Sequence, residues 1–180
     1  MPQSGRLKAA LLKMSKVYLG IDPGIADTGY GLVAASGDGD RCLAYGSIRT
    51  PAGLDPAARF LKLAFELRSV IAKYHPAQAA LERVYFAKNV KTASAVTEAR
   101  GVIRLCLAET EVPCVEYNPS DVKLAVCGSG AAAKGQVQKM VATLLGLEAI
   151  PKPDDAADAL ALALTIAHSR ILSHVSKRQL

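Results

Sequence analysis

The chain has 180 residues, of which 51% are hydrophobic and 21% are charged, a composition that excludes a disordered or fibrous protein and is typical of one globular domain. Twenty-two Lys and Arg residues against sixteen Asp and Glu residues give a net charge of +6. This excess favours a polyanionic partner such as nucleic acid but does not identify one, because many proteins without such a partner are equally basic.

The N-terminal part of the chain predicts an antiparallel meander of three strands. Residues 1–14 show no strand or helix pattern, so we expect a disordered leader, with Met14 as an alternative start. Apolar runs predict strands at about 16–22, 29–36 and 41–49. The first strand ends on Asp22 before a Pro-Gly turn, and Gly37-Asp38-Gly39-Asp40 is a typical hairpin sequence between the other two.

The rest of the chain alternates helices with strands. Strands are predicted at 79–83 and 114–117, and helices at about 55–74, 92–110, 119–128, 134–146 and from Asp154 onward. Gly101 lies in the middle of a predicted helix, which suggests a close approach of another backbone. We expect an α/β domain over 15–172, with a five-stranded mixed sheet (three antiparallel strands, then two parallel ones), helices on both faces and a tail at 173–180.

The cysteines and the longest apolar run indicate the compartment. No C-x-x-C pair occurs among the four cysteines, Cys42, Cys106, Cys114 and Cys127. Lys13 breaks the N-terminal apolar run too early for an export signal. The longest apolar stretch, Ala156–Ala167, contains Asp158 and is too short to cross a bilayer. We therefore expect a cytoplasmic protein with reduced thiols and no membrane partner.

Four acidic residues stand apart from the other charges because apolar residues surround them. Asp22 and Glu82 each end a predicted strand, and we expect these strands to lie side by side with their carboxyl ends together. Asp155 and Asp158 are three residues apart in the last helix, so they share one face. Like charges this close need a counter-charge. Carboxylate oxygens are suitable ligands for Mg²⁺, and a pair of Mg²⁺ ions can promote cleavage of a phosphodiester bond. No histidine lies in these motifs, which disfavours zinc.

Each acid also has a purely structural explanation. Asp22 before Pro-Gly fits a turn residue, and Asp155 fits a first-turn acid that the helix dipole favours. Glu82 has candidate ion-pair partners in Arg83 and Arg100. Asp158 has the weakest structural explanation, because it interrupts an otherwise apolar face.

Several motifs occur in one order along the chain: GIDPG and TGYG (Gly20–Gly24, Thr28–Gly31), LERVYFAKN (Leu81–Asn89), ARG (Ala99–Gly101), the segment around Val122-Lys123, KGQVQKMV (Lys134–Val141) and DAADALALA (Asp155–Ala163). In this combination the chain resembles the bacterial Holliday-junction resolvases of the RuvC family, in the ribonuclease-H-like superfamily. The resemblance extends from about Ser15 to Arg170 and implies a ribonuclease-H-like fold. GIDPG alone is not specific to this family, whereas the full set of motifs in this order is.

By this resemblance, the family's catalytic acids correspond to Asp22, Glu82, Asp155 and Asp158. Lys123 and Lys134 match lysines important for junction cleavage and DNA engagement, and Tyr85 matches an aromatic that stacks near the crossover. The implied function is a structure-selective endonuclease that resolves four-way junctions in homologous recombination and repair, with a branch-migration motor as a partner. A junction has two-fold symmetry, which a C2 homodimer matches, and the resemblance points to the helix of 92–110 as its interface.

Our mechanistic hypothesis has two Mg²⁺ ions per subunit among these acids, with Mn²⁺ as a substitute. Asp22 bridges both ions, and Glu82 holds one of them. Asp155 and Asp158 hold the other. One ion activates water and the other stabilises the leaving 3′ oxygen, which yields a 5′-phosphate and a 3′-hydroxyl.

Basic and aromatic residues near these acids are candidates for DNA contact. The candidate phosphate contacts are Lys88, Lys91, Arg100, Lys123 and Lys134. For Lys91 and Arg100, an ordinary surface charge is an equally good explanation. Tyr85 and Phe86 are adjacent, so we expect one ring in the core and the other against an unstacked base.

Three other functions fit part of the pattern. Sugar-kinase and actin-like ATPases share an Asp and a Gly-rich turn after the first strand, but they need a second domain for which 180 residues leave no room. A related ribonuclease-H-like RNA-processing nuclease is the main alternative, although Lys134–Val141 and the paired aspartates favour the resolvase. A non-enzymatic DNA-binding module would leave the four acids unexplained.

Overall fold

The computed structural model of the chain describes the backbone of residues 15–83 and 90–176 and the side chains of residues 15–83 and 94–169. The strands are β1 (Lys16–Asp22), β2 (Asp27–Ser36), β3 (Gly39–Arg49), β4 (Gln78–Glu82) and β5 (Cys114–Tyr117). The helices are α2 (Pro56–Tyr74), α3 (Val90–Glu109), α4 (Pro119–Cys127), α5 (Lys134–Leu144) and α6 (Asp154–Ser176). Within these ranges, no helix is long and apolar enough to cross a membrane.

The strands form one mixed sheet in the order β3-β2-β1-β4-β5. β1, β2 and β3 pair as an antiparallel meander, whereas β4 runs parallel to β1, and β5 runs parallel to β4. This arrangement confirms the predicted five-stranded mixed sheet. β1 and β4 lie side by side at its centre, so their carboxyl ends meet at one edge.

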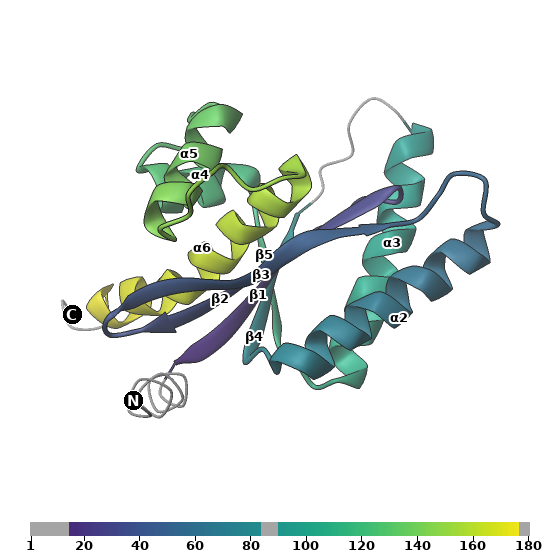
Figure 1. Cartoon of the computed structure of the whole chain (residues 1–180), viewed down its shortest axis with the longest axis horizontal. Coiled ribbons are helices and arrows are strands. Elements are labelled where there is room, and N and C mark those ends of the chain that lie inside the picture. Colours follow the sequence, from purple (N-terminus) through teal and green to yellow (C-terminus); the bar gives the residue numbers. More distant parts are fainter. Residues whose placement is uncertain (1–14, 84–89, 177–180) are drawn as a thin grey trace, which may run out of the picture.

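Helices cover both faces of the sheet, as Figure 1 shows. α6 packs on one face together with α4 and α5, and α2 packs on the other with α3. Successive side chains of β1 point to opposite faces of the sheet and join the two hydrophobic clusters there. Tyr18 belongs to the cluster on the α6 side, while Leu19 and Ile21 are fully buried on the α2 side. Asp22 continues the alternation, so its side chain projects toward the α6 face.

The backbone of α6 lies directly on β1 and β2 because glycines face it. A Cβ atom at Gly20 would lie 1.8 Å from the carbonyl oxygen of Ala159, and one at Gly29 would lie 2.1 Å from that of Asp155. Side chains do not tolerate such distances, so these positions accept only glycine without moving the helix. The start of α6 is therefore held against the ends of the two strands.

α2 begins and ends where the sequence predicts. Asp55 caps it by accepting hydrogen bonds from the backbone N–H groups of Ala57 and Ala58, at 3.0 and 3.4 Å. His75 ends the helix in the left-handed conformation, one residue before Pro76. Leu63, Leu67 and Ile71 are buried on the inward face of this helix.

The expectation for Gly101 was wrong. In the described part of the chain, nothing lies within 4 Å of the position that a Cβ atom would take there, and the residue is exposed. α3 instead packs Ala99, Ile103 and Leu107 into the core, on the opposite side of the helix from Gly101. Among the described residues of the single chain, the glycine therefore makes no close backbone contact.

Candidate active site

Two carboxylates come from neighbouring parallel strands. β1 and β4 pair Ile21 with Leu81, so Asp22 and Glu82 are the next residues in the two strands. Ile21 and Leu81 are buried on the α2 side of the sheet. Alternation therefore turns both carboxylates to the opposite face, where α6 begins.

Asp155 and Asp158 reach the same point from the start of α6. One carboxylate oxygen each from Asp22, Asp155 and Asp158 lie within 4.8 Å of one another. The fourth acid, Glu82, is close enough to Asp22 for its charge to raise the pKa of Asp22. The structure thus brings together the four acids named from the sequence, whose roles in catalysis and metal binding stay predictions.

Three of the acids, Asp22, Glu82 and Asp155, are half-buried beside other carboxylates, and this raises their pKa values. Burial, and then the charges of the three neighbouring acids, raise the pKa of Asp22 from 3.8 to about 8. Burial and then the charge of Asp158 raise the pKa of Glu82, and burial followed by the charge of Asp27 raises that of Asp155. The group is therefore short of positive charge. Since its donors are all carboxylate oxygens, it fits a hard cation such as Mg²⁺ or Mn²⁺ better than Zn²⁺.

Lys134, the first residue of α5, brings positive charge to the acids. Its Nζ lies 3.0 Å from Asp158 Oδ2 and 3.9 Å from Asp154 Oδ2, and the hydrogen bond to Asp158 raises the pKa of Lys134. A cavity of about 200 Å³ opens beside it, with Glu82 and Lys123 in its lining. Both lysines named from the sequence therefore lie around one cavity, on the α4 and α5 side of the acids.

The family profile described as crossover junction endodeoxyribonuclease RuvC matches residues 18–168. The chain belongs to the RuvC family. Relatives of that name from Heliobacterium modesticaldum and Moorella thermoacetica are 52% and 53% identical to it. The matches cover 85% and 82% of this chain, and 94% and 89% of the two relatives. The solved structure of T. thermophilus RuvC in complex with Holliday junction substrate is 34% identical, with a TM-score of 0.84 over 88% of this chain and 96% of the other.

Membership of the RuvC family confirms the resemblance that the motifs suggested, and with it the ribonuclease-H-like fold. The chain carries an acidic group that could hold a metal ion at the edge of its sheet. The match spans all four acids and both lysines of the site, from β1 to α6.

Arg100, a candidate DNA contact, is engaged within this RuvC-family chain. Its Nη2 lies 3.0 Å from Glu116 Oε1, its Nη1 donates to the carbonyl oxygen of Glu82, and 13% of the side chain is exposed. Because the second bond goes to the backbone, the Glu82 carboxylate still faces the site. DNA contact by Arg100 stays a prediction. Four other candidates for DNA contact lie outside the described side chains: Tyr85, Phe86, Lys88 and Lys91.

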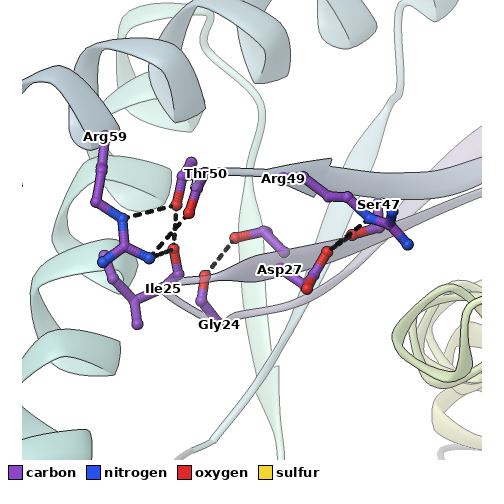
Figure 2. Close-up of polar contacts among 8 residues, drawn as sticks. Gly24, Ile25, Asp27, Ser47, Arg49, Thr50 and Arg59 are labelled. Carbon is purple, nitrogen blue, oxygen red and sulfur yellow. Dashed lines mark hydrogen bonds and ion pairs between the residues drawn. The ribbon is translucent and has the colours of Figure 1, made fainter. Parts of the chain in front are cut away.

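The turn after β1 is held by contacts that the sequence analysis missed (Figure 2). Arg59, from the first turn of α2, donates from Nη2 to the carbonyl oxygens of Ile25 at 2.9 Å and Thr50 at 3.0 Å. Thr28 Oγ1 donates to the carbonyl oxygen of Gly24 at 2.7 Å. These bonds satisfy backbone carbonyl groups and so stabilise the turn directly after the first carboxylate. Arg59 belongs to no motif found in the sequence, and the TGYG motif does not show what Thr28 binds, so only the folded structure reveals these roles.

Proposed function

We propose that the chain is a structure-selective DNA endonuclease that resolves four-way junctions in homologous recombination and repair by metal-dependent hydrolysis. The observation that carries this proposal is the carboxylate group, in which oxygens of three acids lie within 4.8 Å of one another, in a member of the RuvC family. The name of the relatives, crossover junction endodeoxyribonuclease, supports the chemistry. The Holliday junction substrate in the T. thermophilus RuvC structure supports the choice of DNA.

The position of each acid suggests its part in the mechanism. Asp22 interacts with Glu82 and also lies beside the helix aspartates Asp155 and Asp158, so it would be suited to be shared between two ions. Glu82 would then hold one ion, and the two helix aspartates the other. Bound Mg²⁺, with Mn²⁺ as a substitute, supplies an activated water and positive charge beside the leaving 3′ oxygen. The products carry a 5′-phosphate and a 3′-hydroxyl, which a ligase can rejoin.

The two lysines are suited to bind the substrate backbone. Lys134 contacts Asp158 and also faces the cavity that Lys123 lines, so its ammonium group is close both to a site acid and to the space for a phosphate. Charge-assisted hydrogen bonds from ammonium groups would hold the phosphate there. Junction binding should therefore weaken steeply with added salt.

A C2 homodimer on the outer surface of α2 and α3 is the expected assembly. Leu61 and Phe65 are each 72% exposed, and Leu105 is 55% exposed. The ion pair of Arg68 with Glu109, at 2.8 Å, joins the two helices, and Phe65 and Leu105 lie about one turn before it on each. Exposed apolar residues grouped in this way favour an interface, and a dyad supplies one active site for each of two opposed strands. The family resemblance adds a branch-migration motor as a predicted partner.

A cleavage assay on two labelled substrates tests the proposed function. A mobile four-way junction should be nicked symmetrically on two opposed strands when Mg²⁺ is present, and a matched linear duplex should stay intact. Asp22→Asn should bind the junction without cutting it. Cutting of an RNA hairpin but not of the junction would favour the RNA-processing alternative, and junction binding without metal-dependent nicking by the unmodified chain would leave only a binding module.

A further inference from the structure

A polar cluster of Asp27, Ser47 and Arg49 lies beside the candidate active site (Figure 2). Asp27 Oδ1 accepts hydrogen bonds from Ser47 Oγ at 2.8 Å and from Arg49 Nε at 3.2 Å. Asp27 and Arg49 are also direct partners across the antiparallel pairing of β2 with β3. None of the three belongs to the motifs found in the sequence, so the site described above leaves the cluster without a role.

The cluster lies on the same face of the sheet as the carboxylates. Ile48 is buried on the α2 side, so Ser47 and Arg49, on either side of it, point to the α6 face. The strand pairing runs from Asp22 to Gly29 to Ser47. Ser47 is therefore two strands away from Asp22, roughly 10 Å, and Arg49 lies two residues further toward the edge where the site opens.

Arg49 is oriented but still accessible. Its side chain is 74% exposed, and its bond to Asp27 uses only Nε. Within the described ranges, Nη1 and Nη2 donate to no protein acceptor. An exposed ion pair adds little to stability, but it fixes the plane of the guanidinium group. Two N–H groups in a fixed plane match the oxygens of a phosphate.

We propose that Arg49, held by Asp27 and Ser47, binds a backbone phosphate of the junction strand next to the bond that is cut. Lys123 and Lys134 lie on the opposite flank of the acids, so the strand would be held on both sides of the site. This proposal rests on the proposed function, because it assumes that a junction strand crosses the edge of the sheet. Arg49 and its two partners are then a binding element that the family motifs do not include.

The competing explanation is that Arg49 only neutralises Asp27. Asp27 is near enough to Asp155 for its charge to raise the pKa of that group, so an unpaired Asp27 would also repel DNA. Loss of Arg49 would weaken binding under either explanation. The two differ in what happens once Asp27 has lost its charge.

Junction binding by the full chain, measured with EDTA over a range of salt concentrations, tests the proposal. Arg49→Ala should lower the affinity and reduce the slope of log K against log salt by about 1 per subunit, hence by about 2 for a dimer. Arg49→Lys should keep the slope but bind less tightly, because an ammonium group cannot bind a phosphate in bidentate fashion. Arg41→Ala, at the opposite end of β3, is the matched control and should match the unmodified chain.

A double variant separates the two explanations. If Arg49 binds phosphate, Asp27→Asn with Arg49→Ala should still bind less tightly, and with a smaller salt slope, than Asp27→Asn alone. If the effect of Arg49→Ala disappears in the Asp27→Asn background, Arg49 only neutralises Asp27 and the proposal is wrong. If the unmodified chain shows no junction binding, the proposed function fails as well, which is a different result.

Neutral phosphate analogues locate the contact. Methylphosphonate groups placed one at a time along the cut strand should weaken binding of the unmodified chain at a phosphate neighbouring the scissile one. Arg49→Ala should lose its sensitivity at that position and keep it at the others. Equal sensitivity of both proteins at every position would contradict the proposal.

Discussion

The two faces of the sheet are packed in different ways. On the α6 face, glycines let backbone contact backbone, and a Cβ atom at Gly31 would lie 2.6 Å from the backbone nitrogen of Leu160. On the α2 face, large side chains such as Leu19, Leu32 and Leu67 fill the space as in an ordinary hydrophobic core. Because its backbone contacts the strands directly, α6 has little freedom to shift. The acids, which need a precise geometry, lie on this face. The outer surface on the other side carries the two most exposed large apolar residues, Leu61 and Phe65 of α2.

Gly29→Ala should disrupt the packing of α6 on the sheet and cause the largest loss of cleavage activity. The added Cβ atom would displace the backbone at Asp155 and move its carboxylate, and a displacement of about 1 Å can lower a catalytic rate roughly 100-fold. Junction cleavage measured at saturating Mg²⁺ should show this loss. Gly53→Ala, in the turn before α2, is the control, because a Cβ atom there meets nothing in the described structure; it should keep full activity. Full activity of Gly29→Ala would refute the close packing.

Phe65→Glu should disrupt the α2 face without touching the acids. A charge in place of a ring that is 72% exposed should prevent burial of this surface and yield a monomer in sedimentation velocity. Single nicks should persist while paired cleavage of opposed strands falls by about tenfold or more, since the second site is no longer held on the same junction. Leu144→Glu, on α5, is the control and should remain a dimer. A dimeric Phe65→Glu would place the interface elsewhere.

The pH dependence of stability sharpens the contrast between the faces. The pKa of Asp22 is raised from 3.8 to about 8 in the folded chain, so the fold binds this proton more tightly than the unfolded chain does. The resulting stabilisation is complete below about pH 4 and is lost as the pH rises toward 8. Asp22→Asn stays neutral, so in EDTA it should be more stable than the unmodified chain at pH 9, by about 1–3 kcal/mol or roughly 3–10 °C in Tm. Parallel Tm curves for the two proteins across pH 5–9 would contradict this.

Local patterns were sufficient to predict the elements and the four acids. The strand that ends on Asp22 and the helix that begins at Asp154 are marked by apolar runs, turns and i,i+3 spacing within a few residues. β2 begins at Asp27 rather than at the predicted residue 29, because its first residues are held by pairing with β3 and not by an apolar pattern.

What the sequence analysis missed depends on contacts between distant residues. Arg59 with Ile25 and Asp27 with Arg49 are joined only by the fold, and the need for Gly29 is visible only once α6 lies on it. The prediction for Gly101 was wrong for a related reason. A glycine in a helix indicates a close backbone contact only when it is buried, and Gly101 is exposed. Burial of a single position does not follow from local pattern.

Titration of the metal-free chain with Mn²⁺ in a calorimeter tests the central claim most directly, namely that the four acids form one cation site. The unmodified chain should bind two ions per subunit, and Asp22→Asn should lose at least the ion that needs the shared carboxylate. Binding by Asp22→Asn with unchanged number and affinity, or no binding by the unmodified chain at millimolar Mn²⁺, would contradict the account.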